Sequence, residues 1–369
     1  MTASTQVKLK PGDTIGILGG GQLGRMLAMA AARLGLRCQV FSPDPDSPAF
    51  DVVMNATCAE YADVEALELF AGDVDVITYE FENVPAAAAM ILAARRPVLP
   101  DRQILETTQD RLAEKDFVKR LGIGTADYAD VTSAAGLRAA IARIGLPAVI
   151  KTRRFGYDGK GQAIIRDGDD PDRVWADLST RSAILEAFIP FEREVSMIAA
   201  RSADGHVECF DVTENEHRDH ILKISRAPAD ISDALAAQAR DIAESIASAL
   251  NYVGVLAVEM FVVAGAGGPT LLVNEIAPRV HNSGHWTLDG ASISQFEQHI
   301  RAIAGWPLGK PVRHGEVTMT NLIGDEINSY EQWLTVPGAT VHLYGKGPPR
   351  PGRKMGHVTQ VGTLPPKTT

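Results

Sequence analysis

Short apolar strands alternate with helices over the first hundred residues, and this alternation constrains the fold more than any other feature of the chain. The segments 14–18, 37–41 and 75–79 are predicted strands, and an amphipathic helix that follows the first of them ends at Gly35. Strands that alternate with helices form parallel sheets, which bind ligands at the carboxyl ends of their strands. We therefore predict an α/β, Rossmann-like domain over residues 1–105.

The pattern changes after Pro100, and the remaining chain is predicted to be of the α+β class. Strand-like segments separated by tight Gly and Asp turns fill residues 161–213, which favours a mixed or antiparallel sheet. Residues 264–269, rich in glycine, mark the turn of a hairpin. Short strands and Gly/Pro turns make up a small, mostly β C-terminal domain at 306–369. The other expected elements are helices at 102–121, 232–252 and 291–304, and strands at 146–151, 253–263 and 270–276.

Composition and charge exclude several classes of function. The chain has 369 residues, of which 45% are hydrophobic, and a net charge of -10. A protein that binds the nucleic-acid backbone normally carries a basic excess, so we expect no nucleic acid as a partner. Cys38, Cys58 and Cys209 lack the spacing of a zinc site or a disulfide framework. Because there is no signal-peptide pattern and no apolar run long enough to span a membrane, we expect a cytoplasmic protein without a membrane partner.

Gly19, Gly21 and Gly24 match the spacing of the dinucleotide-binding fingerprint. They lie between a predicted strand and a predicted helix, and Asp44 follows about twenty residues later. Taken alone, this arrangement predicts an NAD-dependent enzyme. Its physical basis is broader, because glycines let the backbone N–H groups of a helix N-terminus approach any phosphate. Since Asp44 lies in a proline-rich turn, we favour phosphate binding of another kind over NAD.

Residues 151–162 form a second glycine-rich segment with a different chemistry. Lys151 ends a predicted strand, and Arg153, Arg154 and Lys160 follow it among glycines. Such a loop can fold over a nucleoside triphosphate and neutralise its phosphates. The alternative is an exposed basic hairpin, but the clustering with Lys151 favours the nucleotide.

Glu259 and Glu275 each interrupt an otherwise apolar predicted strand. An unpaired carboxylate inside a sheet is costly and requires a cation or a proton. On adjacent strands of a hairpin the two carboxylates can face one metal site, and hard oxygen ligands favour Mg²⁺ carried by a nucleotide. The alternative is a salt bridge between Glu275 and Arg279. We expect both to hold in part, with metal binding favoured.

Residues 274–286 carry an unusual density of polar groups directly after a predicted buried strand. Buried polar groups must find partners, so this density indicates a site for charged substrates rather than a packed core. Two weaker signals accompany it. The backbone of residues 186–189 is placed to contact an adenine edge, with the Glu194 carboxylate on a ribose, and His217 is equally compatible with a solvated surface position.

Together these segments resemble the ATP-grasp superfamily over about residues 14–360. Within it they resemble the 5-(carboxyamino)imidazole ribonucleotide synthases of purine biosynthesis. The motifs that carry the resemblance are 19–26 (GGGQLGRM), 155–162 (FGYDGKGQ), 274–286 (NEIAPRVHNSGHW), 290–297 (GASISQFE) and 350–357 (RPGRKMGH). The second, third and fifth of these motifs together are highly specific.

The resemblance implies an ATP-dependent carbon–nitrogen ligase. It would carboxylate 5-aminoimidazole ribonucleotide with ATP and bicarbonate through carboxyphosphate, and release ADP and phosphate. Mg²⁺ would accompany ATP, the loop 155–162 would close over the site, and the protein would be a homodimer. The implied organisation is a pre-ATP-grasp domain at 1–105, an ATP-grasp core at 106–305 with its lid at about 125–190, and a C-terminal domain at 306–369.

The resemblance also implies roles for individual residues. ATP would be bound by Arg111, Lys151, Gly156, Tyr157, Asp158, Gly159, Lys160, Gly161, Gln162, Glu186, Ala187, Phe188, Ile189, Glu194, His217, Asn274 and Glu275, with Mg²⁺ on Glu259 and Glu275. The ribonucleotide would be bound by Gly20, Gly21, Gln22, Leu23, Glu80, Asn282, Ser283, Arg353 and Lys354. The catalytic residues would be Asp158, Arg279, His281, His285 and Lys354, with Asp158 orienting or deprotonating the substrate amine.

Three alternatives stay open. A formate-using glycinamide ribonucleotide transformylase has a similar architecture, but the segment 281–286 argues against it. An NAD-dependent oxidoreductase depends on the first glycine loop alone. A non-catalytic nucleotide sensor would have little need of Glu259 and Glu275. One departure from the superfamily also matters: Ala277 stands where many members have asparagine, so Asn274 is expected to substitute.

Overall fold

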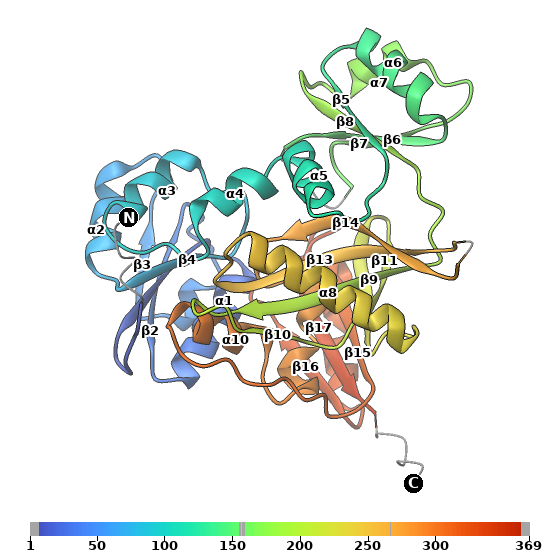
Figure 1. Ribbon diagram of the computed structural model, residues 1–369. Coiled ribbons are helices and arrows are strands. Elements are labelled where there is room, and N and C mark those ends of the chain that lie inside the picture. Colours follow the sequence, from blue (N-terminus) through green and yellow to red (C-terminus); the bar gives the residue numbers. More distant parts are fainter. Residues whose placement is uncertain (1–6, 155, 157–158, 266, 363–369) are drawn as a thin grey trace.

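The N-terminal part of the computed structural model is a parallel sheet flanked by helices (Figure 1). The structure describes residues 7–154, 156, 159–265 and 267–362. The strand order is β3-β2-β1-β4, and every pair is parallel, as the alternation predicted. The elements are β1 (Thr14–Leu18), α1 (Gln22–Arg33), β2 (Arg37–Ser42), η1 (Phe50–Val52), β3 (Asn55–Cys58), α2 (Val64–Gly72), β4 (Val76–Tyr79) and α3 (Ala86–Ala93).

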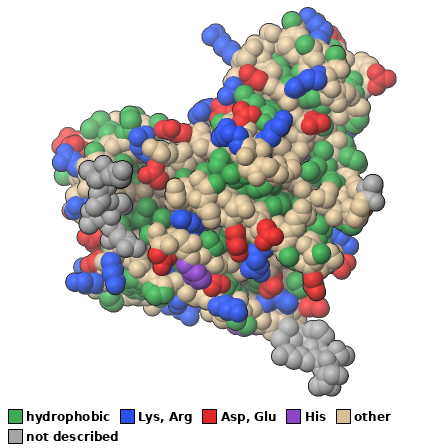
Figure 2. All heavy atoms as spheres, viewed as in Figure 1, with side chains coloured by type: hydrophobic (Ala, Val, Ile, Leu, Met, Phe, Trp, Pro, Cys, Tyr) green, Lys and Arg blue, Asp and Glu red, His purple; other side chains and the backbone are tan. Residues whose placement is uncertain are grey.

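A second, antiparallel sheet forms a lobe that projects from the body of the molecule (Figures 1 and 2). Its order is β5-β8-β6-β7, and α6 and α7 cover it over a small apolar core. In Figure 2, basic and acidic side chains gather where this lobe joins the body. The elements are β5 (Tyr128–Val131), α6 (Ala134–Ile144), β6 (Ala148–Thr152), β7 (Gln162–Ile165), α7 (Pro171–Asp177) and β8 (Ala183–Ala187).

The largest sheet has the order β14-β13-β9-β11-β12-β15-β17-β16, with β10 paired to β9. Strands of the predicted C-terminal domain extend this sheet, because β15 pairs with β12 in antiparallel register. The elements are β9 (Arg193–Arg201), β10 (Val207–Cys209), β11 (Thr213–Arg218), β12 (Ile221–Ala227), α8 (Asp233–Ala249), β13 (Gly254–Val263), β14 (Thr270–Ala277), η2 (Asn282–Gly284), α9 (Thr287–Gly290), α10 (Gln295–Ile303), β15 (Val317–Ile323), η3 (Gly324–Ser329), α11 (Tyr330–Leu334), β16 (Ala339–Leu343) and β17 (Lys354–Val361).

Two apolar layers cover opposite faces of this sheet around β13. Leu256 and Val258 pack in the cluster that includes α8, whereas Val255 and Ala257 pack in the cluster that includes α1 and α10. The alternation follows from the two-residue period of a strand. Glu259 continues the Val255 face, toward the N-terminal part of the molecule.

Three predicted elements differ from the structure. The expected helix at 102–121 is two helices, α4 (Arg102–Thr108) and α5 (Arg111–Arg120), because the Asp110 side chain accepts the N–H groups of Leu112 and Ala113 and so starts a new helix. A helix, α7, interrupts the strand-like region 161–213, with Asp170 as its cap. The last strong helix begins at Gln295, after the capping residue Ser294. Among the described residues, no helix is both long and apolar enough to cross a membrane.

Candidate active site

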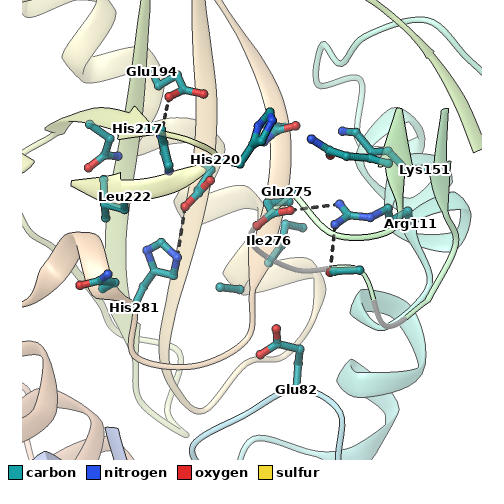
Figure 3. Close-up of a pocket in the computed structure, with 18 of the residues that line it drawn as sticks. Glu82, Arg111, Lys151, Glu194, His217, His220, Leu222, Glu275, Ile276 and His281 are labelled. Carbon is teal, nitrogen blue, oxygen red and sulfur yellow. Dashed lines mark hydrogen bonds and ion pairs between the residues drawn. The ribbon is translucent and has the colours of Figure 1, made fainter. Parts of the chain in front are cut away.

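A cleft of about 1180 Å³ lies where the lobe, the large sheet and the N-terminal sheet meet. In Figure 3, Arg111 and Lys151 approach Glu275 from one side, and His217 and His281 lie on the other. The structure therefore brings together residues that are widely separated in the sequence. The predicted site residues that line the cleft are Gln22, Leu23, Glu80, Arg111, Lys151, Gly156, Gly159, Lys160, Gln162, Phe188, Glu194, His217, Glu259, Asn274, Glu275, Arg279, His281, Asn282 and Lys354.

Other predicted site residues lie elsewhere. Tyr157 and Asp158 fall outside the described residues, so the residue expected to orient or deprotonate the amine has no described position. Nine described residues of the predicted set do not line the cleft. These are Gly20, Gly21, Gly161, Glu186, Ala187, Ile189, Ser283, His285 and Arg353.

Glu259 and Glu275 face each other across the antiparallel pair β13 and β14. The register shifts at this point: Glu259 pairs with Glu275 and Met260 with Val273, which leaves Asn274 as the extra residue of a β-bulge. The bulge lets Val273 point into the core beneath α8 while Glu275, two residues later, points into the cleft. Regular alternation would have placed these two side chains on the same face.

The two carboxylates have different partners and ionise differently. His281 Nε2 lies 3.1 Å from Glu259, and Arg111 donates to Glu275 at 3.1 Å. Burial and the neighbouring Glu275 raise the pKa of Glu259 to about 7. Burial also opposes the ionisation of Glu275, but Arg111 and Lys151 hold its pKa below the ordinary value. Glu275 is therefore the ionised carboxylate of the pair, and a bound cation would favour the ionisation of Glu259.

Arg279 does not form the predicted salt bridge with Glu275. Its guanidinium instead pairs with Glu82, with Nη2 at 3.2 Å from Oε1, and the ion pair keeps the arginine charged against the cost of burial. Burial opposes the ionisation of Glu82, yet Arg279 lowers its pKa to about 2. The alternative derived from the sequence was wrong because it considered only neighbours along one strand.

A buried carboxylate anchors two lysines beside the cleft. Glu186 Oε2 lies 3.1 Å from Lys151 Nζ and 3.5 Å from Lys115 Nζ. Although burial disfavours its charge, the two lysines lower the pKa of Glu186 to about 2. The Glu186 side chain thus holds Lys151 in place, whereas the Phe188 side chain lines the cleft.

His217 is not a solvated surface residue. It lies on β11 with 25% of its side chain exposed, and its Nδ1 is 2.5 Å from Glu194 on the neighbouring strand β9. Burial lowers the pKa of His217, but Glu194 outweighs this and raises it above the ordinary value. The two residues form a polar pair that faces the cleft (Figure 3).

Glu80 occupies the first glycine loop. Its carboxylate accepts the N–H groups of Gly21 and Gly24 at the N-terminus of α1, the second at 2.6 Å. A Cβ on Gly21 would lie 2.5 Å from Glu80 Oε1, so glycine is required here by the packing of this carboxylate. The loop therefore already holds a carboxylate of the protein itself, although burial raises the pKa of Glu80. Asp44, in turn, accepts the N–H of Asp46 in a local turn.

The segment after β14 divides between the cleft and the core. Asn282 lines the cleft, is 8% exposed, and has no partner for either side-chain polar atom within the described part of the chain. His285, which was predicted to be catalytic, is fully buried between Gln295, Phe296 and His357. Burial keeps the pKa of His285 well below its ordinary value. His285 does not line the cleft, because the chain turns inward after Asn282.

Sequence reasoning missed other residues of the cleft. Glu114, on α5, accepts the N–H of Ile276 at 3.1 Å behind the carboxylate pair, and burial together with Glu275 raises its pKa to about 8. It lies three residues after Arg111, so helical spacing alone could have indicated that both face the same way. Further lining residues outside the predicted set include Glu82, Asn83, Gln109, Asn215 and His220.

Models of three protein domains match successive parts of the chain. The ribonucleotide synthetase preATP-grasp domain matches residues 13–109, and the ATP-grasp domain matches 116–296. The C-terminal domain of phosphoribosylaminoimidazole carboxylase matches residues 317–367. The predicted fold class is thereby confirmed.

Individual relatives agree over almost the whole chain. The N5-carboxyaminoimidazole ribonucleotide synthase of Brucella melitensis is 51% identical over 358 residues, covering 96% of this chain and 98% of its own. A crystal structure of an N5-carboxyaminoimidazole ribonucleotide synthetase with ADP superposes with a TM-score of 0.92 at 41% identity, covering 97% of this chain and 94% of that one. The crystal structure of the Aspergillus clavatus enzyme with ADP and 5-aminoimidazole ribonucleotide superposes with a TM-score of 0.88 at 31% identity. It covers 96% of this chain and 95% of that one. The chain belongs to the N5-carboxyaminoimidazole ribonucleotide synthase family of ATP-grasp ligases.

Proposed function

We propose that the protein carboxylates the exocyclic amine of 5-aminoimidazole ribonucleotide, using ATP and bicarbonate and releasing ADP and phosphate. The observation that carries the proposal is the position of the facing pair Glu259 and Glu275. On one side of the pair lie the cations Arg111 and Lys151, and on the other lies Arg279 with the segment 281–282. A phosphoryl group that leaves ATP on the first side can meet bicarbonate on the second without leaving the cleft.

The nucleotide side is proposed to bind ATP through charge. Lys151 and Arg111 would neutralise the phosphates, and the loop that contains Gly156 and Lys160 would cover them. Glu194 and His217 would bind the ribose end, with the backbone of 186–189 at the base. The crystal structures of relatives named as complexes with ADP or ATP support a nucleotide in this fold.

The carboxylate pair fits Mg²⁺ carried by ATP. Glu259 and Glu275 offer hard oxygen ligands, and Asn274 adds a buried side-chain oxygen that has no partner among the described residues. No group of three or more His, Cys, Asp or Glu ligands occurs in the described parts of the chain. Two carboxylates completed by phosphate oxygens suit Mg²⁺, which rarely relies on protein ligands alone. When bound, the ion would stabilise charge that develops on the transferred phosphoryl group.

The substrate side is proposed to position bicarbonate and the ribonucleotide. Bicarbonate attacks the γ-phosphorus of ATP to give carboxyphosphate and ADP; the substrate amine then captures the carboxyl carbon, and phosphate leaves. Arg279 and Lys354 supply positive charge, and the amide of Asn282, which has no partner among the described residues, supplies a donor and an acceptor. Because carboxyphosphate hydrolyses readily, the loop 155–162 is proposed to exclude water, and Asp158 to take the proton from the amine.

Several finer points belong to the same proposal. The family membership disfavours the formate-using transformylase and the NAD-dependent oxidoreductase as alternatives. The domain limits 1–105, 106–305 and 306–369 and the homodimer are part of the proposal and are based on the family resemblance. The cytoplasmic location is also part of the proposal.

The proposal is tested by ADP release. We expect release that requires both 5-aminoimidazole ribonucleotide and bicarbonate, and none with formate and glycinamide ribonucleotide. Glu275→Gln should abolish this release, whereas Glu60→Gln, the same change at an exposed position, should leave it unchanged. Release by Glu275→Gln near the wild-type rate would show that the metal assignment is wrong.

A further inference from the structure

A chain of buried hydrogen bonds connects His281 to the interior of the large sheet. His281 Nδ1 lies 2.9 Å from Ser283 Oγ, which lies 2.7 Å from Ser196 Oγ on β9. The chain continues to Asn215 Nδ2 on β11 at 3.0 Å, and from Asn215 Oδ1 to Ser225 Oγ on β12 at 2.9 Å. The three serines are fully buried, and Asn215 is 7% exposed.

The directions of these hydrogen bonds follow from one backbone group. The N–H of Ser283 points to His281 Nδ1 at 3.3 Å and can only donate, so a proton on Nδ1 would face another proton. The Ser283 hydroxyl then also donates to Nδ1, and its oxygen accepts from Ser196. Ser196 in turn accepts from the amide NH₂ of Asn215, and Asn215 accepts from Ser225. A single set of donors and acceptors satisfies every member.

We propose that Ser283, Ser196 and Asn215 are positioning residues that hold His281 in the tautomer with its proton on Nε2. The donor Nε2–H is thereby presented to the cleft, where Glu259 Oε1 lies 3.1 Å away. The tautomer follows from the hydrogen bonds alone, and its consequence for turnover rests on the proposed function.

The tautomer matters because a neutral imidazole carries its single ring proton on either Nδ1 or Nε2. Because Nδ1 accepts hydrogen bonds, the proton of the neutral ring lies on Nε2. With the opposite tautomer, a lone pair of Nε2 would face the Glu259 carboxylate, and the two acceptors would repel each other. A fixed Nε2–H instead orients Glu259, or a bicarbonate oxygen in its place, at no cost of reorganisation during the reaction.

Asn215→Asp at pH 8 is the sharpest test. A carboxylate can only accept, so Ser196 would donate to residue 215 and accept from Ser283, which reverses the chain and turns the Ser283 hydroxyl away from His281. We expect the ¹⁵N resonance of His281 Nδ1, identified with the variant His281→Gln, to move toward the protonated position. Turnover should fall by about 10- to 100-fold, with KM for ATP unchanged. Ser283→Ala, which removes the hydroxyl donor, should shift the same resonance in the same direction.

Two controls separate this role from general damage. Ser225→Ala removes a buried hydroxyl from the end of the hydrogen-bond chain and leaves the direction of the other hydrogen bonds unchanged. The His281 resonance should therefore stay in place. Asn55→Asp makes the same chemical change at an exposed position and should alter neither readout. A wild-type His281 with protonated Nδ1 would overturn the inference, as would wild-type resonance and turnover in both Asn215→Asp and Ser283→Ala. If the wild-type protein released no ADP at all, the proposed function would fail, but the resonance would still decide the tautomer.

Discussion

The substitution Glu259→Gln is expected to stabilise the nucleotide-free protein at alkaline pH while it abolishes ligase activity. Glutamine keeps the shape of the side chain and can still accept from His281 Nε2. It removes the negative charge that faces Glu275 across the β13–β14 pair. The wild-type protein, without a cation, must keep that charge in a buried position.

The magnitude follows from the pKa of Glu259. Burial and Glu275 raise the pKa from 4.5 to about 7, and each pKa unit corresponds to about 1.4 kcal/mol. A raised acid pKa contributes stability that is fully present below pH 4.5 and is lost as the pH rises through about 7. The wild-type protein should thus lose up to about 3 kcal/mol of unfolding free energy over that range. The glutamine variant should not show this loss.

Urea unfolding at pH 5 and pH 8.5 measures the difference. The two proteins should have similar unfolding free energies at pH 5, and the variant should be more stable by up to about 3 kcal/mol at pH 8.5. Adding Mg²⁺ and ADP should stabilise the wild type more than the variant, because a bound ligand stabilises the state that binds it. Glu60→Gln is the exposed control. An equal effect of pH on wild type and variant would refute the argument from buried like charges.

Three further predictions concern stability and are checked by urea unfolding. Gly21→Ala should cost about 1–3 kcal/mol, because the new Cβ would meet the Glu80 carboxylate at 2.5 Å; a neutral effect would contradict the close packing of the loop. Asp110→Ala should cost about 1–2 kcal/mol, because α5 loses its N-cap. Trp286→Phe should cost about 1–3 kcal/mol, because it leaves the buried Thr213 hydroxyl without the indole N–H at 2.9 Å; an unchanged midpoint would mean that another group replaces this donor.

Local spacing was enough to predict much of the fold. The N-terminal βαβ alternation and the β13–β14 hairpin have periods and turn residues that depend only on neighbours in the chain. The same spacing located Glu259 and Glu275, since a carboxylate in an apolar strand stands out from its surroundings. Sequence spacing did not predict helix boundaries that a single side chain sets. The predicted helix at 102–121 is divided into α4 and α5 because the Asp110 side chain caps the start of α5.

The sequence by itself determined which residue types the site contains, because polar groups at predicted strand ends must find partners. Only the tertiary structure decided how those groups pair. The extra residue Asn274 turns Glu275 to the Glu259 face, and Arg111 reaches Glu275 from a helix 164 residues away in the chain. Glu80 fills the glycine loop from a neighbouring strand. Such pairings depend on register, bulges and packing between distant segments, which local sequence patterns do not encode.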